Sequence, residues 1–344
     1  MRSVRRAAAL VALAVLLAAC SATDGKTTPP PSSSDDPAPP ATETAETPEA
    51  TTTSSAADPA PDAAGPGTLY LAPGSQAAAA WQAATGEEKA LLARIAQQPQ
   101  ATWIGDWVDA ATARDQVAAL TAGALEADQV AVLVLYAIPG RDCGLHSAGG
   151  VETSEYAAWV ETVASGIQGS PIVVLEPDAL AQLGDCDGQG DRAGFLAHAA
   201  RVLDEAGSRV YLDAGNSGWH PAAETARRIE LVGTQHLAGF ALNTSNYWAT
   251  ADSRAYGEQV SAALGGLRFV VDTSRNGNGS NGEWCNPRGR ALGEAPRLVD
   301  DGTALDALLW VKSPGESDGA CNGGPAAGAW WQEIALELAR NATG

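Results

Sequence analysis

Residues 171–178 read Pro-Ile-Val-Val-Leu-Glu-Pro-Asp, a short apolar run that ends in two carboxylates on either side of a proline. Uninterrupted apolar runs of about four to eight residues are typical of strands that are buried on both faces of a parallel sheet. Runs of the same kind, rich in Val, Leu, Ile or aromatic residues, predict further strands at 102–105, 130–138, 209–214, 237–243, 268–273 and 308–312.

Amphipathic segments of helical length lie between most of these strands. They predict helices at 110–125, 154–167, 192–205, 221–231 and 256–264, with an opening helix near 76–97 and a closing helix near 328–340. The alternation of about seven strands with helices predicts an α/β fold, built either as a parallel β/α barrel or as a doubly wound sheet.

The composition excludes some classes of protein. The chain has 344 residues, 45% hydrophobic and 18% charged, so it can bury a core and is not disordered throughout. Its formal net charge of −20 argues against nucleic-acid binding, because phosphates are neutralised by clustered Lys and Arg. No glycine-rich phosphate-binding motif opens a helix, so a nucleotide cofactor lacks its usual sign. The ten Trp residues suit sugar binding and an ordinary core equally well.

The N-terminus has the pattern of an export signal. Three Arg residues among the first six are followed by an apolar run at 7–19, which is too short to span a bilayer. The run is followed by Cys20 in the sequence Leu-Ala-Ala-Cys, which resembles a bacterial lipobox. Residues 1–19 are therefore predicted to be a lipoprotein signal peptide and Cys20 the lipidated residue; an ordinary signal peptide is the alternative. Residues 20–67, mostly Thr, Pro, Ser and Ala, predict a disordered tether before a folded domain at 68–344. We expect an exported protein, anchored to the membrane through Cys20 or released.

Four further cysteines support export. An even number in an exported chain fits two disulfides, with three possible pairings, and free buried thiols are the alternative; the residues are Cys143, Cys186, Cys285 and Cys321. Because no Cys-x-x-Cys pair occurs, the spacing does not indicate a zinc site, and we expect no metal.

Polar residues recur where the predicted strands end. In parallel α/β folds these ends share one edge, which carries the active site. Helix capping by Asp explains one or two of them, but not a set that includes Arg, Lys and Trp. The set is Trp103, Arg141, Asp142, Glu176, Asp178, Asp213, Asn216, Asn243, Asn246, Asp272, Lys312, Glu316 and Asp318.

Several carboxylates with Trp residues, and no nucleophilic Ser or Cys signature, suit glycoside hydrolysis. In that reaction a protonated carboxylic acid gives its proton to the leaving oxygen, while a second carboxylate activates water or attacks carbon. A neighbouring carboxylate raises the pKa of the acid, because two nearby negative charges repel.

Two motifs resemble the signatures of glycoside hydrolase family 6. They are Val-Leu-Tyr-Ala-Ile-Pro-Gly-Arg-Asp-Cys at 134–143 and Val-Val-Leu-Glu-Pro-Asp-Ala-Leu at 173–180, and the stretches 211–215, 310–312 and 314–319 are similar to later blocks of that family. The resemblance covers about residues 68–342. It implies a cellulase domain that cleaves β-1,4-glucan with inversion on a distorted parallel β/α barrel of about seven strands, without a cofactor.

The same resemblance implies roles for individual residues. Asp178 is expected to be the general acid, and Asp142 the carboxylate that keeps the pKa of the acid high and helps to order water; a salt bridge to Arg141 is the alternative for Asp142. Tyr136 is expected beside the sugar at the cleavage point, where it favours ring distortion, or else in the core. Asp318 matches the proposed base, the alternative being a ligand to Lys312 or a loop cap.

Substrate contacts and disulfides also follow from the resemblance. Lys312 and Glu316 are expected to contact sugar hydroxyls, and Asn243 is assigned to substrate binding with them. Stacking platforms, each with a core position as the alternative, are expected at Trp103, Trp219 and Trp310. The implied disulfides are Cys143–Cys186 and Cys285–Cys321. Two departures are Asn216, where the family often has His, and the spacing from Asp318 to Cys321.

The length of the domain favours endo action, because about 275 residues leave little chain for loops that enclose a tunnel. We therefore expect an endoglucanase, monomeric, whose partner is a β-1,4-glucan polysaccharide. The alternatives are a surface lipoprotein that binds glucan without cutting it, an exo-acting cellobiohydrolase of the same family, and an enzyme that remodels a cell-wall glycan.

Overall fold

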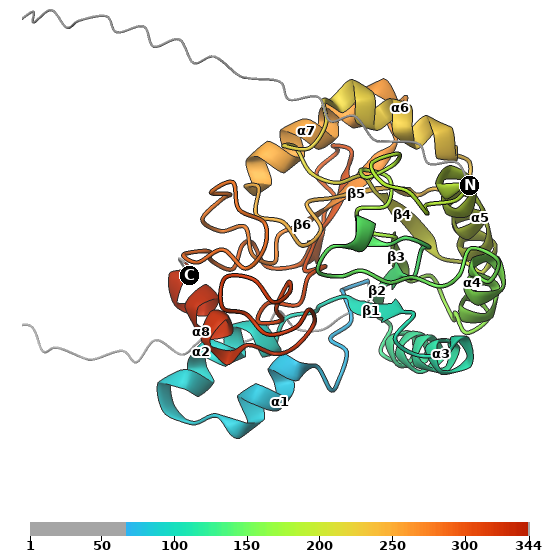
Figure 1. Cartoon of the computed structure of the whole chain (residues 1–344). Helices are drawn as coiled ribbons and strands as arrows, with labels where there is room; N and C mark the ends of the chain where they lie inside the picture. Colours follow the sequence, from blue (N-terminus) through green and yellow to red (C-terminus); the bar gives the residue numbers. More distant parts are fainter. Residues whose placement is uncertain (1–66, 343–344) are drawn as a thin grey trace, which may run out of the picture. The chain divides into compact units, whose positions relative to one another are not determined.

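The computed structural model describes residues 67–342 (Figure 1). The predicted signal peptide, Cys20 and almost all of the predicted tether lie outside the described residues. The described chain forms one sheet of eight strands in the order β1-β2-β3-β4-β5-β6-β8-β7. The strands are β1 (Thr102–Gly105), β2 (Val132–Tyr136), β3 (Ile172–Leu175), β4 (Arg209–Asp213), β5 (Gly239–Leu242), β6 (Arg268–Asp272), β7 (Arg297–Leu298) and β8 (Leu305–Leu309).

All neighbouring strands from β1 to β8 are parallel, and only the two-residue β7 pairs antiparallel, at the outer edge of β8. In the described part of the chain no ladder joins β1 to β8. Two individual hydrogen bonds connect these two edges of the sheet instead. The Ala101 N–H donates to the Trp310 carbonyl at 2.9 Å, and the Trp103 indole N–H donates to the Val311 carbonyl at 2.8 Å. The predicted distorted parallel barrel of about seven strands is thus confirmed, with β7 as an unpredicted eighth strand.

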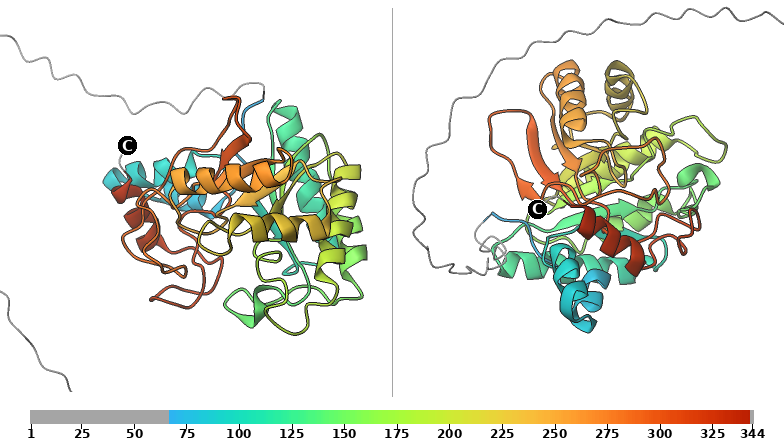
Figure 2. Two further views of the ribbon diagram at one scale, coloured as in Figure 1. Left: turned by 90° about the horizontal axis from the view of Figure 1, so that it is seen from above. Right: turned by 90° about the vertical axis from the view of Figure 1, so that its left-hand side faces the viewer.

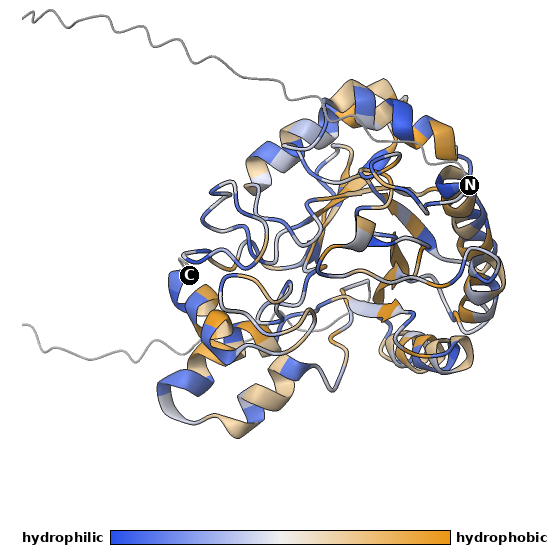
Figure 3. Cartoon of the chain, viewed as in Figure 1, coloured by the Kyte–Doolittle hydropathy of each residue, from blue (hydrophilic) through white to orange (hydrophobic). Residues whose placement is uncertain are grey.

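The strands read as continuous apolar runs because both of their faces are buried. Alternate residues such as Val134, Val174 and Val270 pack inside the barrel, while Leu133 and Leu175 pack outward against the helices. In Figure 3 hydrophobic colour runs along much of the strands, whereas the helices carry hydrophobic and hydrophilic residues side by side.

Five helices follow the strands in an arc around the barrel (Figure 1). They are α3 (Ala110–Glu126), α4 (Tyr156–Ala164), α5 (Arg192–Glu205), α6 (Ala222–Val232) and α7 (Thr250–Ala263). Asp109 and Asp191 cap α3 and α5 by accepting hydrogen bonds from the N–H groups of Thr112 and Gly194. The predicted start of α7 at residue 256 is wrong by six residues, since the helix already begins at Thr250.

Three helices form a separate layer outside β8. They are α1 (Gln76–Ala83), α2 (Gly86–Ala96) and α8 (Gln332–Asn341), and the two further views in Figure 2 show α1 and α2 standing beside α8. The single opening helix predicted near 76–97 is wrong, because the chain leaves the helix at Ala84 and restarts at Gly86, which has a φ of +57°. Within residues 67–342 no helix is both long and apolar enough to cross a membrane.

Candidate active site

The turn after β3 brings two carboxylates to the carboxyl end of the sheet. Glu176 and Asp178 both have positive φ, at 48° and 68°, a backbone conformation that non-glycine residues rarely adopt. Glu176 is fully buried and accepts hydrogen bonds from the Ala137 N–H at 2.9 Å, the Ile138 N–H at 3.0 Å and the Tyr156 hydroxyl at 2.9 Å. Burial raises its pKa to about 7. Glu176 therefore ties the end of β3 to the end of β2 and is committed to structure.

Asp178 lies two residues further and is held by its backbone. Its N–H donates to Asp213 Oδ1 at 3.0 Å, whereas among the described residues no group donates a hydrogen bond to its side-chain carboxyl. Burial and the negative charges of Asp213, Asp142 and Asp318 raise the pKa of Asp178 well above its ordinary value. A half-buried carboxyl group with a raised pKa and no hydrogen-bond donor among the described residues is equipped to give a proton to a bound ligand.

Asp213 ends β4 and anchors this turn. Its Oδ1 also accepts the Gly215 N–H at 3.1 Å, and burial raises its pKa to about 6. Its Oδ2 is buried and lacks a hydrogen-bond partner within residues 67–342. Asp213 thus positions Asp178 and places a negative charge next to it.

Asp142 stands on the loop after β2. Its Oδ2 accepts the Ser147 N–H at 2.8 Å. Arg141 forms its salt bridge with Asp106, so the alternative of an Arg141–Asp142 pair is not observed. The Arg141 guanidinium instead lies 4.4 Å from the centroid of the Tyr136 ring and donates to the Tyr136 carbonyl at 2.7 Å.

Tyr136 is buried at the end of β2 and meets Trp103 edge to face, with ring centroids 5.2 Å apart. Burial and the charges of Asp178 and Asp142 raise the pKa of its hydroxyl well above the usual range. The phenol therefore stays neutral beside these two carboxyl groups and remains a hydrogen-bond donor.

Asp318 differs from Asp178 because it is fully engaged. It pairs with Arg275 at 2.9 Å and lies 3.7 Å from Lys312 Nζ, and it accepts hydrogen bonds from the Tyr247 hydroxyl and the Asn286 N–H. The cations Arg275 and Lys312 outweigh burial and lower the pKa of Asp318. The alternative of a ligand to Lys312 is therefore observed, and Arg275 is the stronger partner.

Lys312 and Glu316 flank this loop. Burial lowers the pKa of Lys312, whose Nζ donates to the Ser317 carbonyl at 3.2 Å. Glu316 is half-buried, has a raised pKa because of burial, and accepts a hydrogen bond from Gln76 Nε2 at 2.7 Å. Both polar groups are held in place at the carboxyl end of β8.

Two predicted substrate contacts are wrong. Trp310 is only 3% exposed and packs with Leu92, Ile95 and Leu338 between β8 and the outer helices, so it offers no ring face to a ligand. Asn243 is fully buried. Its amide donates to the Asp272 carbonyl at 2.8 Å and accepts the Trp248 N–H, so it holds a loop.

Residues 68–342 match the family model described as glycosyl hydrolases family 6. The chain belongs to this family. It is 65% identical over 274 residues to Endoglucanase A of Cellulomonas fimi, and the aligned region covers 80% of this chain and 61% of that protein. It is 41% identical over 304 residues to Endoglucanase 1 of Streptomyces halstedii, covering 82% of this chain and 93% of that protein.

A solved structure of a family 6 protein has the same fold. The endoglucanase Cel6 of Mycobacterium tuberculosis, in complex with methyl-cellobiosyl-4-deoxy-4-thio-β-D-cellobioside, superposes with a TM-score of 0.76 at 39% identity, covering 83% of this chain and 100% of that one. The family 6 domain described here spans less than two thirds of the length of the Cellulomonas relative.

The family 6 domain has three residues near its site that the sequence did not single out. Trp107 and Trp284 are exposed by 53% and 46%, unusual for Trp, and Trp107 lies 5.9 Å from the Arg141 guanidinium. Arg275 is the buried partner of Asp318. Trp219 and Trp103 are half-buried, so each retains some accessible ring. Exposure, which only the fold reveals, is the signal that separates these Trp residues from Trp310.

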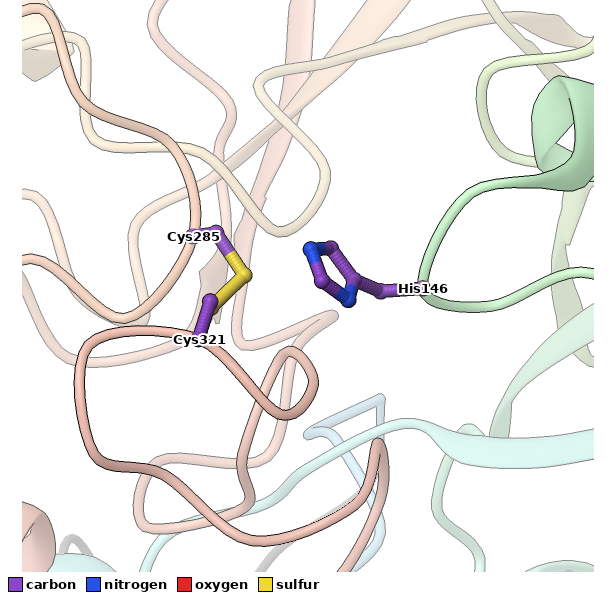
Figure 4. A group of neighbouring side chains, drawn as sticks. All are labelled: His146, Cys285 and Cys321. Atoms are coloured by element: carbon purple, nitrogen blue, oxygen red, sulfur yellow. A yellow bond between two sulfur atoms is a disulfide. The ribbon is translucent and has the colours of Figure 1, made fainter.

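Both disulfides implied by the resemblance are present in this family 6 domain. Cys143–Cys186 follows Asp142 directly, and Cys285–Cys321 closes a loop that contains Asp318. The sulfurs of the second disulfide and a ring nitrogen of His146 lie within 4.8 Å of one another (Figure 4). Because the sulfurs are bonded to each other, they offer no thiolate to a metal ion.

His146 joins the two acidic loops. Its ring centroid is 5.7 Å from that of Trp284, and a Cβ added to Gly319 would lie 2.6 Å from the His146 Cβ. In Figure 4 the imidazole points from its loop toward the opposite disulfide. The loop that carries Asp142 therefore touches the loop that carries Asp318, a contact that loop length alone does not reveal.

Proposed function

We propose that residues 68–342 hydrolyse internal β-1,4-glucosidic bonds of cellulose or a related β-glucan, with inversion, as an endoglucanase. The two relatives and the solved structure reported above are all named endoglucanases. The observation that carries the proposal is Asp178, whose carboxyl has a raised pKa and no hydrogen-bond donor among the described residues.

In the proposed reaction Asp178 gives its proton to the glycosidic oxygen as the bond to the anomeric carbon breaks. A water molecule attacks that carbon from the opposite face, which gives inversion, and its proton passes to the carboxylate of Asp318 directly or through further water molecules. Asp142 keeps the pKa of Asp178 high through its negative charge, and the neutral Tyr136 hydroxyl donates to the sugar at the cleavage point. Asp318 is a weak base, because its ion pair with Arg275 lowers its pKa.

Substrate contacts are proposed for polar and aromatic side chains at this edge; among them Lys312 is 8% exposed and presents its ammonium group only to a ligand that enters the site. Lys312 and Glu316 bind sugar hydroxyls, since ammonium and carboxylate groups match hydroxyl acceptors and donors. Trp103 and Trp219 stack on sugar rings, and the more exposed Trp107 and Trp284 flank the site.

The test compares the wild-type chain with Asp178→Asn on carboxymethyl cellulose, following viscosity and reducing ends together. We expect the wild type to lower viscosity quickly with few new ends, and Asp178→Asn to lose roughly 10²–10⁴-fold in rate while it still binds glucan. Full turnover by the variant would contradict the assignment of the acid. Glucan binding without cleavage by the wild type would instead support a surface glucan-binding protein, and a slow viscosity fall would support exo action.

Export and anchoring are part of the same proposal. A lipid on Cys20 and a tether at 20–67 would hold the domain at 68–344 on the outside of a membrane, and the two disulfides fit an extracellular protein. Cys20→Ala should move the protein from the membrane fraction to the medium. Equal membrane retention of the variant would contradict lipidation at this residue.

A further inference from the structure

A groove of about 450 Å³ lies between α1 and the start of α8, a size within the range of ligand sites. No predicted or proposed role so far involves it. Methyl groups and one indole ring line the groove together with three polar side chains: Ala79, Ala80, Ala83, Ala84, Trp330, Gln76, Glu88 and Gln332.

Two residues that line the groove contact Glu316, a residue of the proposed substrate site. Gln76, which lines the groove, donates its side-chain N–H groups to Glu316 Oε1 at 2.7 Å and to the Gly328 carbonyl at 2.9 Å. Trp330 forms an isolated antiparallel bridge with Glu316. Its ring also lies against Gly315, where an added Cβ would come within 2.5 Å of it. Gln76 and Trp330 thus border both Glu316 and the groove.

The chemistry of the lining fits a neutral sugar chain. Pyranose rings present apolar faces and a rim of hydroxyl groups, and an indole with neighbouring methyl groups supplies a matching apolar surface. Gln76 and Gln332 can donate and accept hydrogen bonds, and Glu88 can accept them. The lining contains a carboxylate and no Lys or Arg, so an anionic ligand would be repelled.

We propose that the groove between α1 and α8 binds glucosyl units of a β-1,4-glucan chain that continues past Glu316 out of the catalytic cleft. The inference rests on the proposed function, because the occupant is the same polysaccharide. It adds a length-dependent binding site to the domain, so longer chains gain contacts that short oligosaccharides cannot make.

The test uses Ala83→Arg, which places a long side chain in the groove from an exposed position on α1. Ala119→Arg, at an exposed position on α3, is the matched control. We expect the ratio of kcat/KM for cellohexaose to that for cellotetraose to fall about tenfold in Ala83→Arg and to stay at the wild-type value in the control. Trp330→Ala should lower the same ratio, provided that its thermal unfolding shows a folded protein.

A binding measurement separates the groove from catalysis. In the Asp178→Asn background, isothermal titration with cellohexaose should show a weaker Kd when Ala83→Arg is added. If the wild type cleaves oligosaccharides and Ala83→Arg leaves both the ratio and this Kd unchanged, the groove proposal is overturned while the proposed function stands. If the wild type cleaves no glucan, the proposed function itself fails.

Discussion

Asp213→Asn should shift the pH dependence of hydrolysis without rebuilding the site. Asp213 Oδ1 accepts the N–H groups of Asp178 and Gly215, and an Asn Oδ1 can accept both bonds. The substitution puts an NH₂ group where the buried Oδ2 has no partner in the described chain. The main change is therefore the loss of one negative charge beside Asp178.

The size of the shift follows from the spacing. Asp178 N lies 3.0 Å from Asp213 Oδ1, which places the two carboxyl groups roughly 5–7 Å apart. At an effective dielectric constant of about 20, two charges about 6 Å apart interact by about 3 kcal/mol, equivalent to about 2 pKa units. Because Asp178 is half-buried, solvent screening reduces this to about 1–2 units.

The direction of the shift follows from the proposed role of Asp178 as the acid. Activity falls as pH rises through the pKa of Asp178, and the charge of Asp213 raises that pKa once the pH exceeds about 6, the pKa of Asp213 itself. Removing the charge lowers the pKa of Asp178, so the alkaline limb of kcat/KM on a soluble cello-oligosaccharide should move about 1–2 units to lower pH.

A surface variant controls for net charge. Asp204→Asn changes the charge equally at an exposed residue that pairs with His236, and it should leave the profile in place. Thermal unfolding of both variants checks that they are folded. An alkaline limb of Asp213→Asn that stays at the wild-type pH, or moves to higher pH, would refute the reasoning.

Three further perturbations probe the loops. Arg275→Met leaves the buried Asp318 carboxylate without its main partner and should cost about 3–5 kcal/mol of stability, so an unchanged midpoint in urea unfolding would contradict the importance of this pair. Replacing both Cys285 and Cys321 with Ser opens a loop with a sequence separation of 36 residues and should lower the free energy of unfolding by up to about 4 kcal/mol, measured by denaturant titration against the wild type. His146→Ala removes the contact between the acidic loops and should increase the viscosity drop per new reducing end; an identical ratio would show that the contact does not limit entry of the chain.

The fold was largely predictable because its strands are short, apolar and buried on both faces. The helix predicted at 192–205 and the strand at 102–105 have the observed bounds. The last parallel strand was predicted three residues too late, because Trp-Val at 310–311 continues the apolar run beyond the end of the strand. The N–H groups of Val311 and Lys312 instead donate to the carboxylate of Asp272, an interaction between distant residues that no local pattern reveals.

The site was predictable where motifs fix it and unpredictable where burial decides. Asp142, Asp178 and Asp318 occur within recognisable motifs, and the structure places them close enough for their charges to raise the pKa of Asp178. Trp310 lies within such a motif and yet faces the outer helices, whereas Trp284 is exposed in a polar loop. Both residues are Trp in the sequence, and only the packing of the folded chain shows which ring is accessible to a ligand and which lies in the core.

The carboxylates at the strand ends look equivalent in the sequence but differ in the number of hydrogen bonds that they accept in the structure. The two oxygens of Asp272 accept four backbone N–H groups, those of Ser245, Ser274, Val311 and Lys312. Each such bond favours the ionised form, while burial raises the pKa of Asp272, and the four bonds commit both of its oxygens to holding loops rather than to a ligand. Glu176 is similarly engaged by two N–H groups and the Tyr156 hydroxyl.

Asp178 is the opposite case. Its backbone is fixed through Asp213, while the described protein leaves both of its carboxyl oxygens without a donor and surrounds them with negative charge. Protonation is the least costly way to relieve such an environment, and the proton then points to whatever occupies the site. The carboxyl group of Asp178, which we propose to be the acid, thus differs from those of Glu176 and Asp272 because it accepts no hydrogen bond from the described residues, whereas theirs hold neighbouring loops.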